Sequence, residues 1–177
     1  MYGRWLAATA VVLLLGATSC SDDDDDTAES SSTSSTTTPT TVSPEAEVKT
    51  AYKAFADMGA RLLQAPNPED PEIAQRTSGE AQADLITGLT QLRDAGQHYE
   101  LGPQYGQEVL SVALTDTGAT GKVCVVEDSQ LVASSGEVLA QGVTTVVWTV
   151  DLVEPAGTWF VDRIVEGEVQ EGAVPCN

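Results

Sequence analysis

The spacing of hydrophobic residues changes once along the chain and divides it into a helical part and a strand-forming part. In the first part, apolar residues recur every three or four positions, which is typical of one buried helix face. Ser43 is suited to cap this helix and Pro44 to begin it. The stripe comprises Val48, Ala51, Tyr52, Phe55, Met58 and Leu62. We therefore predict a helix that starts at Pro44 and ends before the prolines at 66 and 68.

A second helix is predicted from about Thr77, because Thr77 and Glu80 have the spacing of a capping box. Gly96 is suited to end it. Between the two helices, residues 72–76 are expected to form one short extra turn. The apolar side of the second helix is Ala81, Leu85, Leu89 and Leu92.

From Tyr99 onward the apolar residues alternate, which is typical of strands with one buried face. Strands are predicted at 109–115, 122–126, 143–153 and 159–165, with turns at 116–118, 134–136 and 155–157. Two faces without ionisable groups are expected to point inward. They are Leu110, Val112 and Leu114 in the first strand, and Val146, Trp148, Val150 and Leu152 in the longest one.

Helices followed by a meander of antiparallel strands predict an α+β domain with the helices on one face of the sheet. The element order, the Trp159-Phe160-Val161 start of the last strand and the Lys-poor, Val/Thr/Gly-rich composition resemble the NTF2-like superfamily over about residues 44–170. That resemblance implies N-terminal helices packed in the hollow of a cone-shaped, curved sheet. The chain departs from it in having no clear strand between the first two helices. A cystatin-like α+β roll is the alternative fold.

Charge restricts the partners of the protein. The chain has 27 acidic and 8 basic residues. Nucleic acid is excluded as a partner, because affinity for phosphate backbones requires Lys and Arg. An anionic membrane surface would also repel the domain, so membrane attachment must come from a covalent or inserted anchor.

Residues 1–19 have the features of a signal peptide. Arg4 precedes the apolar run 6–15, and small residues lead to Cys20. The run is too short to cross a bilayer, which needs about 20 residues. At Thr18-Ser19-Cys20 the sequence resembles the lipobox of bacterial lipoproteins of the high-GC Gram-positive type, which implies lipid on Cys20 and an extracytoplasmic, membrane-anchored protein. Ala17 departs from the usual Leu of that motif, and cleavage that leaves a secreted protein is the alternative.

Residues 20–43 are predicted to be a disordered tether. This segment begins with an Asp run at 22–26 and continues almost entirely with Ser and Thr. It has no apolar period, so it has nothing to bury that would offset the entropy of ordering. The Asp run lacks the spaced ligands and glycine of a calcium loop, and a solvated spacer is the simpler interpretation. The folded domain is expected over residues 44–177.

With Cys20 lipidated, an even pair of cysteines is left in an oxidising compartment. We predict a disulfide bond between Cys124 and Cys176. Closing a loop of about fifty residues stabilises the fold by about 4 kcal/mol in the loop-entropy account. A zinc site would need more ligands, and the chain has one histidine, His98. No cofactor or metal is predicted.

The sequence carries no strong catalytic motif. It has neither a nucleophile elbow nor a Gly-rich phosphate loop. Candidates to line a pocket are Tyr52, Phe55 and Trp148, although residues of this kind are more often plain core. If an enzyme is hidden in this fold, Asp162 is the expected base, assisted by His98 or Tyr99.

Three function classes follow. The first is a non-catalytic domain of a membrane-anchored lipoprotein that binds a small apolar ligand or an envelope protein. The second is an accessory subunit of an envelope transport complex, as some membrane-attached NTF2-like proteins are. The third and least favoured is a small isomerase or dehydratase.

Overall fold

The computed structural model describes residues 42–176, and the helices precede all of the strands. The helices are α1 (Pro44–Gln64), α2 (Pro71–Arg76) and α3 (Gly79–Asp94). The strands are β1 (Gln97–Leu101), β2 (Gly106–Thr115), β3 (Gly118–Ala133), β4 (Val138–Val153), β5 (Phe160–Val165) and β6 (Val169–Glu171). A short 3-10 helix, Pro155–Gly157, joins β4 to β5. The α+β prediction is confirmed.

The first helix begins as predicted, and the third begins differently. Ser43 Oγ accepts a hydrogen bond from the Ala46 amide at 3.3 Å, which satisfies one free N–H of the first turn of α1. The capping box predicted at Thr77 is wrong. The Thr77 hydroxyl donates back to the Ile73 carbonyl at 2.7 Å, and Ser78 is the N-cap of α3. Gly96 does follow the end of α3 with a left-handed φ of 63°.

The sheet is antiparallel and effectively four strands wide. Its two central strands, β3 and β4, pair along nearly their whole length, from Gly118↔Val153 to Val132↔Val138. Two short strands share the outer side of each: β1 and β2 pair with β3, and β5 and β6 pair with β4. The long strands therefore carry the sheet, and the short strands complete its edges.

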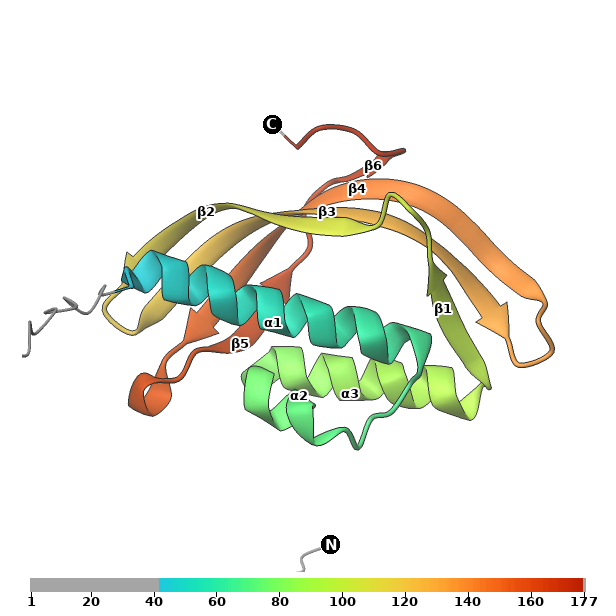
Figure 1. Ribbon diagram of the computed structural model, residues 1–177, viewed down its shortest axis with the longest axis horizontal. Coiled ribbons are helices and arrows are strands. Elements are labelled where there is room, and N and C mark those ends of the chain that lie inside the picture. Colours follow the sequence, from blue (N-terminus) through green and yellow to red (C-terminus); the bar gives the residue numbers. More distant parts are fainter. Residues whose placement is uncertain (1–41, 177) are drawn as a thin grey trace, which may run out of the picture. The chain divides into compact units, whose positions relative to one another are not determined.

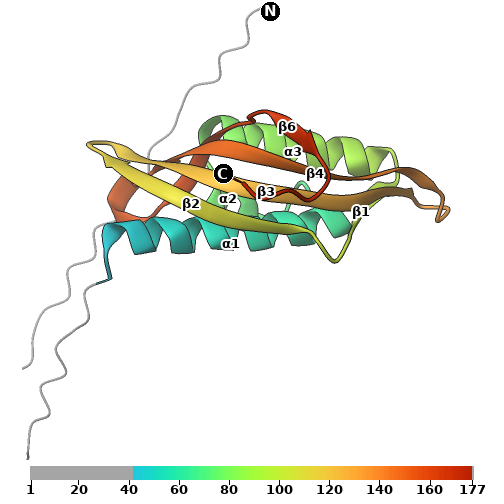
Figure 2. The ribbon, with the colours of Figure 1, turned by 90° about the horizontal axis from the view of Figure 1, so that it is seen from above.

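The sheet curls into a half-barrel with the helices on its concave side (Figure 1). The register shifts at three places, where the extra residues are Leu110 in β2, Leu139 in β4 and Asp162 in β5. Such bulges bend a strand and increase its twist. Seen from above, α1 lies along the β2 edge and α3 along the opposite one (Figure 2). The helices approach the sheet most closely at the flanking strands β1, β2 and β5.

The bulge in β2 overturns one prediction about the buried faces. Leu110, which was expected to point inward, is the extra residue of the bulge and is 41% exposed. Leu114 pairs with the buried Ala119 near the end of the strand but is 43% exposed. Val112 packs against the core as predicted, and Val109, which was not expected to, packs there as well. The extra residue at the bulge changes the alternation, so that Val109 and Val112 share the inner face although they are three positions apart.

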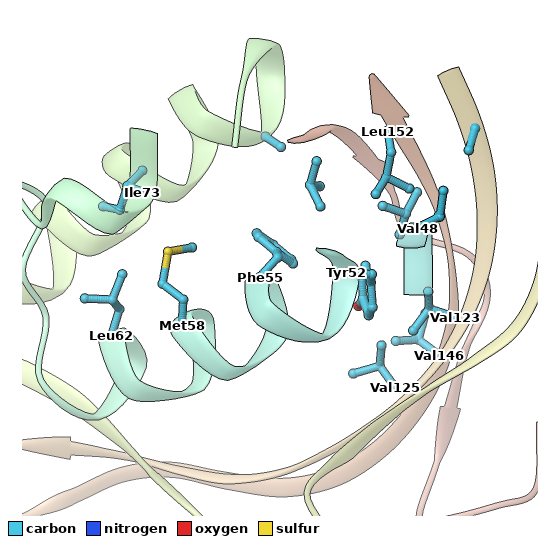
Figure 3. Close-up of a cluster of buried hydrophobic side chains, with 14 of the residues drawn as sticks. Val48, Tyr52, Phe55, Met58, Leu62, Ile73, Val123, Val125, Val146 and Leu152 are labelled. Atoms are coloured by element: carbon cyan, nitrogen blue, oxygen red, sulfur yellow. The ribbon is translucent and has the colours of Figure 1, made fainter. Parts of the chain in front are cut away.

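The core fills one end of the hollow, which we call the closed end. There, Val48 and Tyr52 of α1 meet the concave face of the sheet at Val123, Val146 and Leu152, all five of which are buried (Figure 3). Farther along α1 the buried side chains belong to a layer between helices and include Met58, Leu62 and Ile73. The helical stripe predicted for α1 is therefore its buried face.

The convex side of the sheet is covered in part by the C-terminal segment (Figure 1). Cys176 forms a disulfide bond with Cys124 of β3, with a Cα–Cα distance of 5.8 Å, as the sequence predicts. Thr145 is buried beneath this segment. Its hydroxyl donates to the Gly172 carbonyl at 2.9 Å and accepts from the Val174 amide at 3.1 Å. The segment after β5 is thus fixed at three points, β6, Thr145 and the disulfide.

Several predictions lie outside residues 42–176: the signal peptide at 1–19, lipidation of Cys20, and nearly all of the tether at 20–43. Within the described range, none of the helices has the length and apolar character needed to span a membrane.

Candidate ligand-binding cavity

Beside the closed end, the hollow of the sheet contains a cavity of about 760 Å³. Its walls come from α1 and α3 on one side and from the concave face of the sheet, chiefly β1 and β3, on the other. We call this part of the hollow the open end. A volume of this size is typical of sites that hold small molecules.

The helical wall is made mostly of small and apolar residues, with Asp84 and Gln91 as its polar members. Leu63 of α1 and Leu85 and Leu92 of α3 line the cavity together with two glycines, Gly59 and Gly88. A Cβ atom built on either glycine would have no neighbour within 4 Å. Glycine within a helix costs about 1 kcal/mol relative to alanine. Neither close packing nor a left-handed φ explains these two glycines, and their effect is to leave the cavity wider.

The sheet wall mixes apolar and polar residues. Alternate residues of β3, Val125, Glu127, Ser129 and Leu131, all line the cavity, as expected for one face of a strand. Tyr99, opposite Leu131 in the ladder, adds an aromatic ring from β1.

A hydrogen-bonded chain connects the closed end to the cavity. The Tyr52 hydroxyl, at the boundary, donates to Gln107 Oε1. Gln107 Nε2 then donates to the Tyr105 hydroxyl at 2.9 Å. Burial raises the pKa of Tyr52, with a smaller effect from Tyr105, and burial is also the main cause that raises the pKa of Tyr105. Both phenols are therefore neutral near pH 7 and act as hydrogen-bonding groups.

Glu127 is the most unusual ionisable group in the cavity. Its carboxylate is half-buried and accepts a weak 3.4 Å hydrogen bond from the Thr144 hydroxyl, which stands opposite it on β4. Burial raises the pKa of Glu127, the nearby Glu166 raises it further, and the hydrogen bond from Thr144 opposes both. We call Tyr105, Gln107 and Glu127 the polar wall.

The structure separates the three residues predicted to line a pocket. Phe55 and Trp148 do line the cavity. Tyr52 lies in the core, with its ring centroid 5.8 Å from that of Phe55, and touches the cavity only through Gln107. The Val146 to Leu152 face is apolar as expected, but the interior as a whole is not. The sequence reasoning missed the polar wall, although the alternation from Val125 to Leu131 could have indicated it.

The residues named for a hypothetical enzyme are not brought together. Asp162 accepts a 2.7 Å hydrogen bond from the Ser78 hydroxyl at the start of α3, and it does not line the cavity. His98 lies in β1 with its Nε2 3.9 Å from Glu100, also outside the cavity lining, whereas Tyr99 faces the cavity. Asp151 is also outside the cavity lining, and it pairs with Arg163 at 2.6 Å.

The described residues contain no group of three or more His, Cys, Asp or Glu side chains placed to hold a metal ion. The chemistry available in the cavity is therefore that of apolar contact, hydrogen bonding and one half-buried carboxylate.

Comparison with known proteins identifies neither a family nor a curated relative. No family model matches the chain, and no curated protein matches it. Among solved structures, it is similar to the intermembrane space region of the chloroplast protein ARC6, with a TM-score of 0.56 and 13% sequence identity over 67% of this chain and 92% of that one. A de novo designed β-sheet protein matches with a TM-score of 0.38 and 18% identity over 72% of this chain and 92% of that one. The first likeness concerns the fold alone.

Proposed function

We propose that residues 44–176 form a non-catalytic binding domain that holds a small, largely apolar ligand in the open end of the hollow. The observation that carries this proposal is the cavity of about 760 Å³, whose helical wall is mainly apolar and includes two glycines, with Asp84 and Gln91 as its polar members. Burying an apolar ligand there would gain about 25 cal/mol for each Å² removed from water. The base expected for an enzyme, Asp162, is hydrogen-bonded to Ser78 and does not line the cavity.

We further propose that the domain is NTF2-like and that it acts outside the cytoplasm, anchored by lipid on Cys20. The helices in the hollow of a curled sheet support the first part. The apolar run before Thr18-Ser19-Cys20 and the disulfide between Cys124 and Cys176 support the second. If the anchor is lipid, Cys20→Ala releases the protein from membranes, and equal partitioning of variant and wild type would contradict it.

The binding proposal is tested by filling the cavity from one point on α3. Gly88→Leu places a side chain in open space, so the fold is expected to persist while bound ligand is lost. The measurement is native mass spectrometry of the full chain purified from its host, followed by titration with a dodecyl amphiphile read by tryptophan fluorescence, since Trp148 lines the cavity.

Ala83→Leu is the matched control, because Ala83 is exposed on the same helix and outside the cavity lining. It adds the same side chain and should leave binding unchanged. Equal binding by wild type and Gly88→Leu would refute the cavity as the site. Loss of binding in both variants would also refute it.

A further inference from the structure

The charges that line the cavity are all of one sign. Asp84 and Glu127 are the carboxylates of the lining, and among the described residues that line it there is no Lys, Arg or His. A ligand with a carboxylate or phosphate head would therefore meet like charge without a cation to pair with it. Like charges in a partly buried site repel, because solvent screens them less than at a surface.

Glu127 also lacks the partners that a carboxylate of this burial normally has. Its one hydrogen bond from the described residues is the long contact with Thr144. The negative charge of Glu166 raises the pKa of Glu127 and so opposes its ionisation. Most buried carboxylates are paired with a cation or accept several hydrogen bonds. A ligand that brings a positive charge or strong donors to this carboxylate would remove that deficit.

The rest of the polar wall is arranged to accept such a group. Gln107 uses its carbonyl oxygen to accept from Tyr52 and its amide to donate to Tyr105. The Tyr105 oxygen thus already accepts one hydrogen bond. The hydrogen bonds within the wall fix Gln107 and Tyr105 beside Glu127, and they leave the carboxylate oxygens as the main free acceptors.

We propose that the ligand is an amphiphile with a protonated amine head, bound with its head at Glu127 and its apolar chain along the helical wall toward Gly59 and Gly88. This proposal rests on the proposed function and adds the chemical class of the ligand. Charge-assisted hydrogen bonds between an ammonium group and a carboxylate are about twice as strong as neutral ones. A hydroxyl head can make weaker hydrogen bonds at the same place, and an anionic head is repelled.

The test compares three ligands with one dodecyl chain: dodecylamine, 1-dodecanol and dodecanoate, each below its aggregation concentration. Titration of the full chain should give the tightest binding for the amine, about tenfold weaker binding for the alcohol, and the weakest for the carboxylate. Glu127→Gln should remove the preference of the amine over the alcohol.

Glu108→Gln is the matched control for nonspecific attraction of a cation to this acidic chain, because Glu108 is exposed on β2 and outside the cavity lining. It should keep the preference for the amine. If dodecanoate binds as tightly as dodecylamine, or if Glu127→Gln keeps the preference, the amine-head proposal is wrong while the cavity still binds amphiphiles. If no ligand binds in a way that Gly88→Leu abolishes, the proposed function itself fails.

Discussion

The two ends of the hollow are built from the same elements and packed in opposite ways. At the closed end, Val48 and Tyr52 of α1 reach the sheet and exclude water, and Val150 opposite them is fully buried. At the open end, α1 presents Gly59 to the same sheet and a cavity remains. One helix thus packs against the sheet in its first half and lines the cavity in its second, where Met58 and Leu62 remain buried between the helices.

This difference shows that the residues that stabilise the fold and the residues that line the cavity lie at different ends of the hollow. Close-packed interiors are stabilised by dispersion contacts and by the removal of apolar surface from water, and they do not tolerate voids. A cavity loses part of the dispersion contacts and part of the buried apolar surface, so the packing elsewhere must be enough to keep the protein folded. Here the closed end, the layer between the helices and the disulfide-linked C-terminal segment supply the stability, and the open end is free to differ.

The largest expected effect comes from the covalent link behind the closed end. The Cys124–Cys176 bond joins residues 52 apart in sequence. Replacing both cysteines by alanine should lower the free energy of unfolding by about 4 kcal/mol, because the unfolded chain regains the entropy of an open loop. Urea denaturation measures the change, and wild type reduced with dithiothreitol should match the variant. An unchanged midpoint would mean that β6 and Thr145 hold the segment without the bond.

The second prediction compares equal truncations at the two ends. Leu152→Ala at the closed end, where Leu152 is 2% exposed, should cost about 3 kcal/mol because it leaves a void in packed core. Leu85→Ala, which borders the cavity, should cost about 1 kcal/mol because part of its surface already faces open space. Thermal denaturation of both variants provides the comparison. Equal losses would show that the open end is as tightly packed as the closed end.

The third prediction concerns the two helical glycines at the open end and their effects on stability and on ligand binding. Gly59→Ala and Gly88→Ala should each raise the free energy of unfolding by about 1 kcal/mol, because alanine favours the helix and its Cβ meets nothing. Both should weaken ligand binding as the cavity narrows. Gly136→Ala is the control, since its φ of 85° lies in a turn and alanine there should destabilise. Destabilisation by the helical variants would mean that these glycines have a packing role.

The smallest expected effect concerns Glu127 and pH. Burial and Glu166 raise its pKa above the ordinary 4.5, so the folded chain binds this proton more tightly than the unfolded chain. Its contribution favours folding at low pH and is lost as the pH rises through the folded pKa. Glu127→Gln should therefore raise the stability at pH 7 by less than about 1 kcal/mol, since the group is only half-buried.

The measurement is the denaturation midpoint of the ligand-free chain at several pH values above 4.5. Tyr105 and Glu166 also face Glu127, and Tyr105 stays neutral throughout this range. Glu108→Gln, on the exposed face of β2, should leave the profile as in wild type. A flat difference between Glu127→Gln and wild type would mean that Glu127 is fully solvated.

Most of the fold could be predicted from the sequence because local patterns determine it. The stripe from Val48 to Leu62 marks the buried face of α1, and the prolines after it mark its end. The alternation around Trp148 likewise identifies the inner face of β4. These features depend on neighbours within one element, and a single sequence contains them.

The exceptions depend on contacts between distant residues. The bulge at Leu110 brings Val109 to the inner face of β2 together with Val112, and no local signal places it. Ser78, not Thr77, is the N-cap residue of α3, and its hydroxyl makes no capping bond because it donates to Asp162, 84 positions away. The polar wall was not predicted for a related reason, because Gln107 and Glu127 come together only when β2 and β3 pair. The amino-acid composition also does not show which part of the interior remains an unfilled cavity.

The long hairpin of β3 and β4 also has a consequence for how quickly and in what order the chain can fold. Each strand has 16 residues, and the turn between them is closed by a hydrogen bond from the Gly136 amide to the Ala133 carbonyl at 2.8 Å. Pairing can therefore extend residue by residue from a short loop, without the entropy of closing a long one. The flanking strands and helices then add to a ladder already in place. The rate of folding should depend on the hairpin, whereas the cavity, which needs α1, α3 and β1 together, forms last.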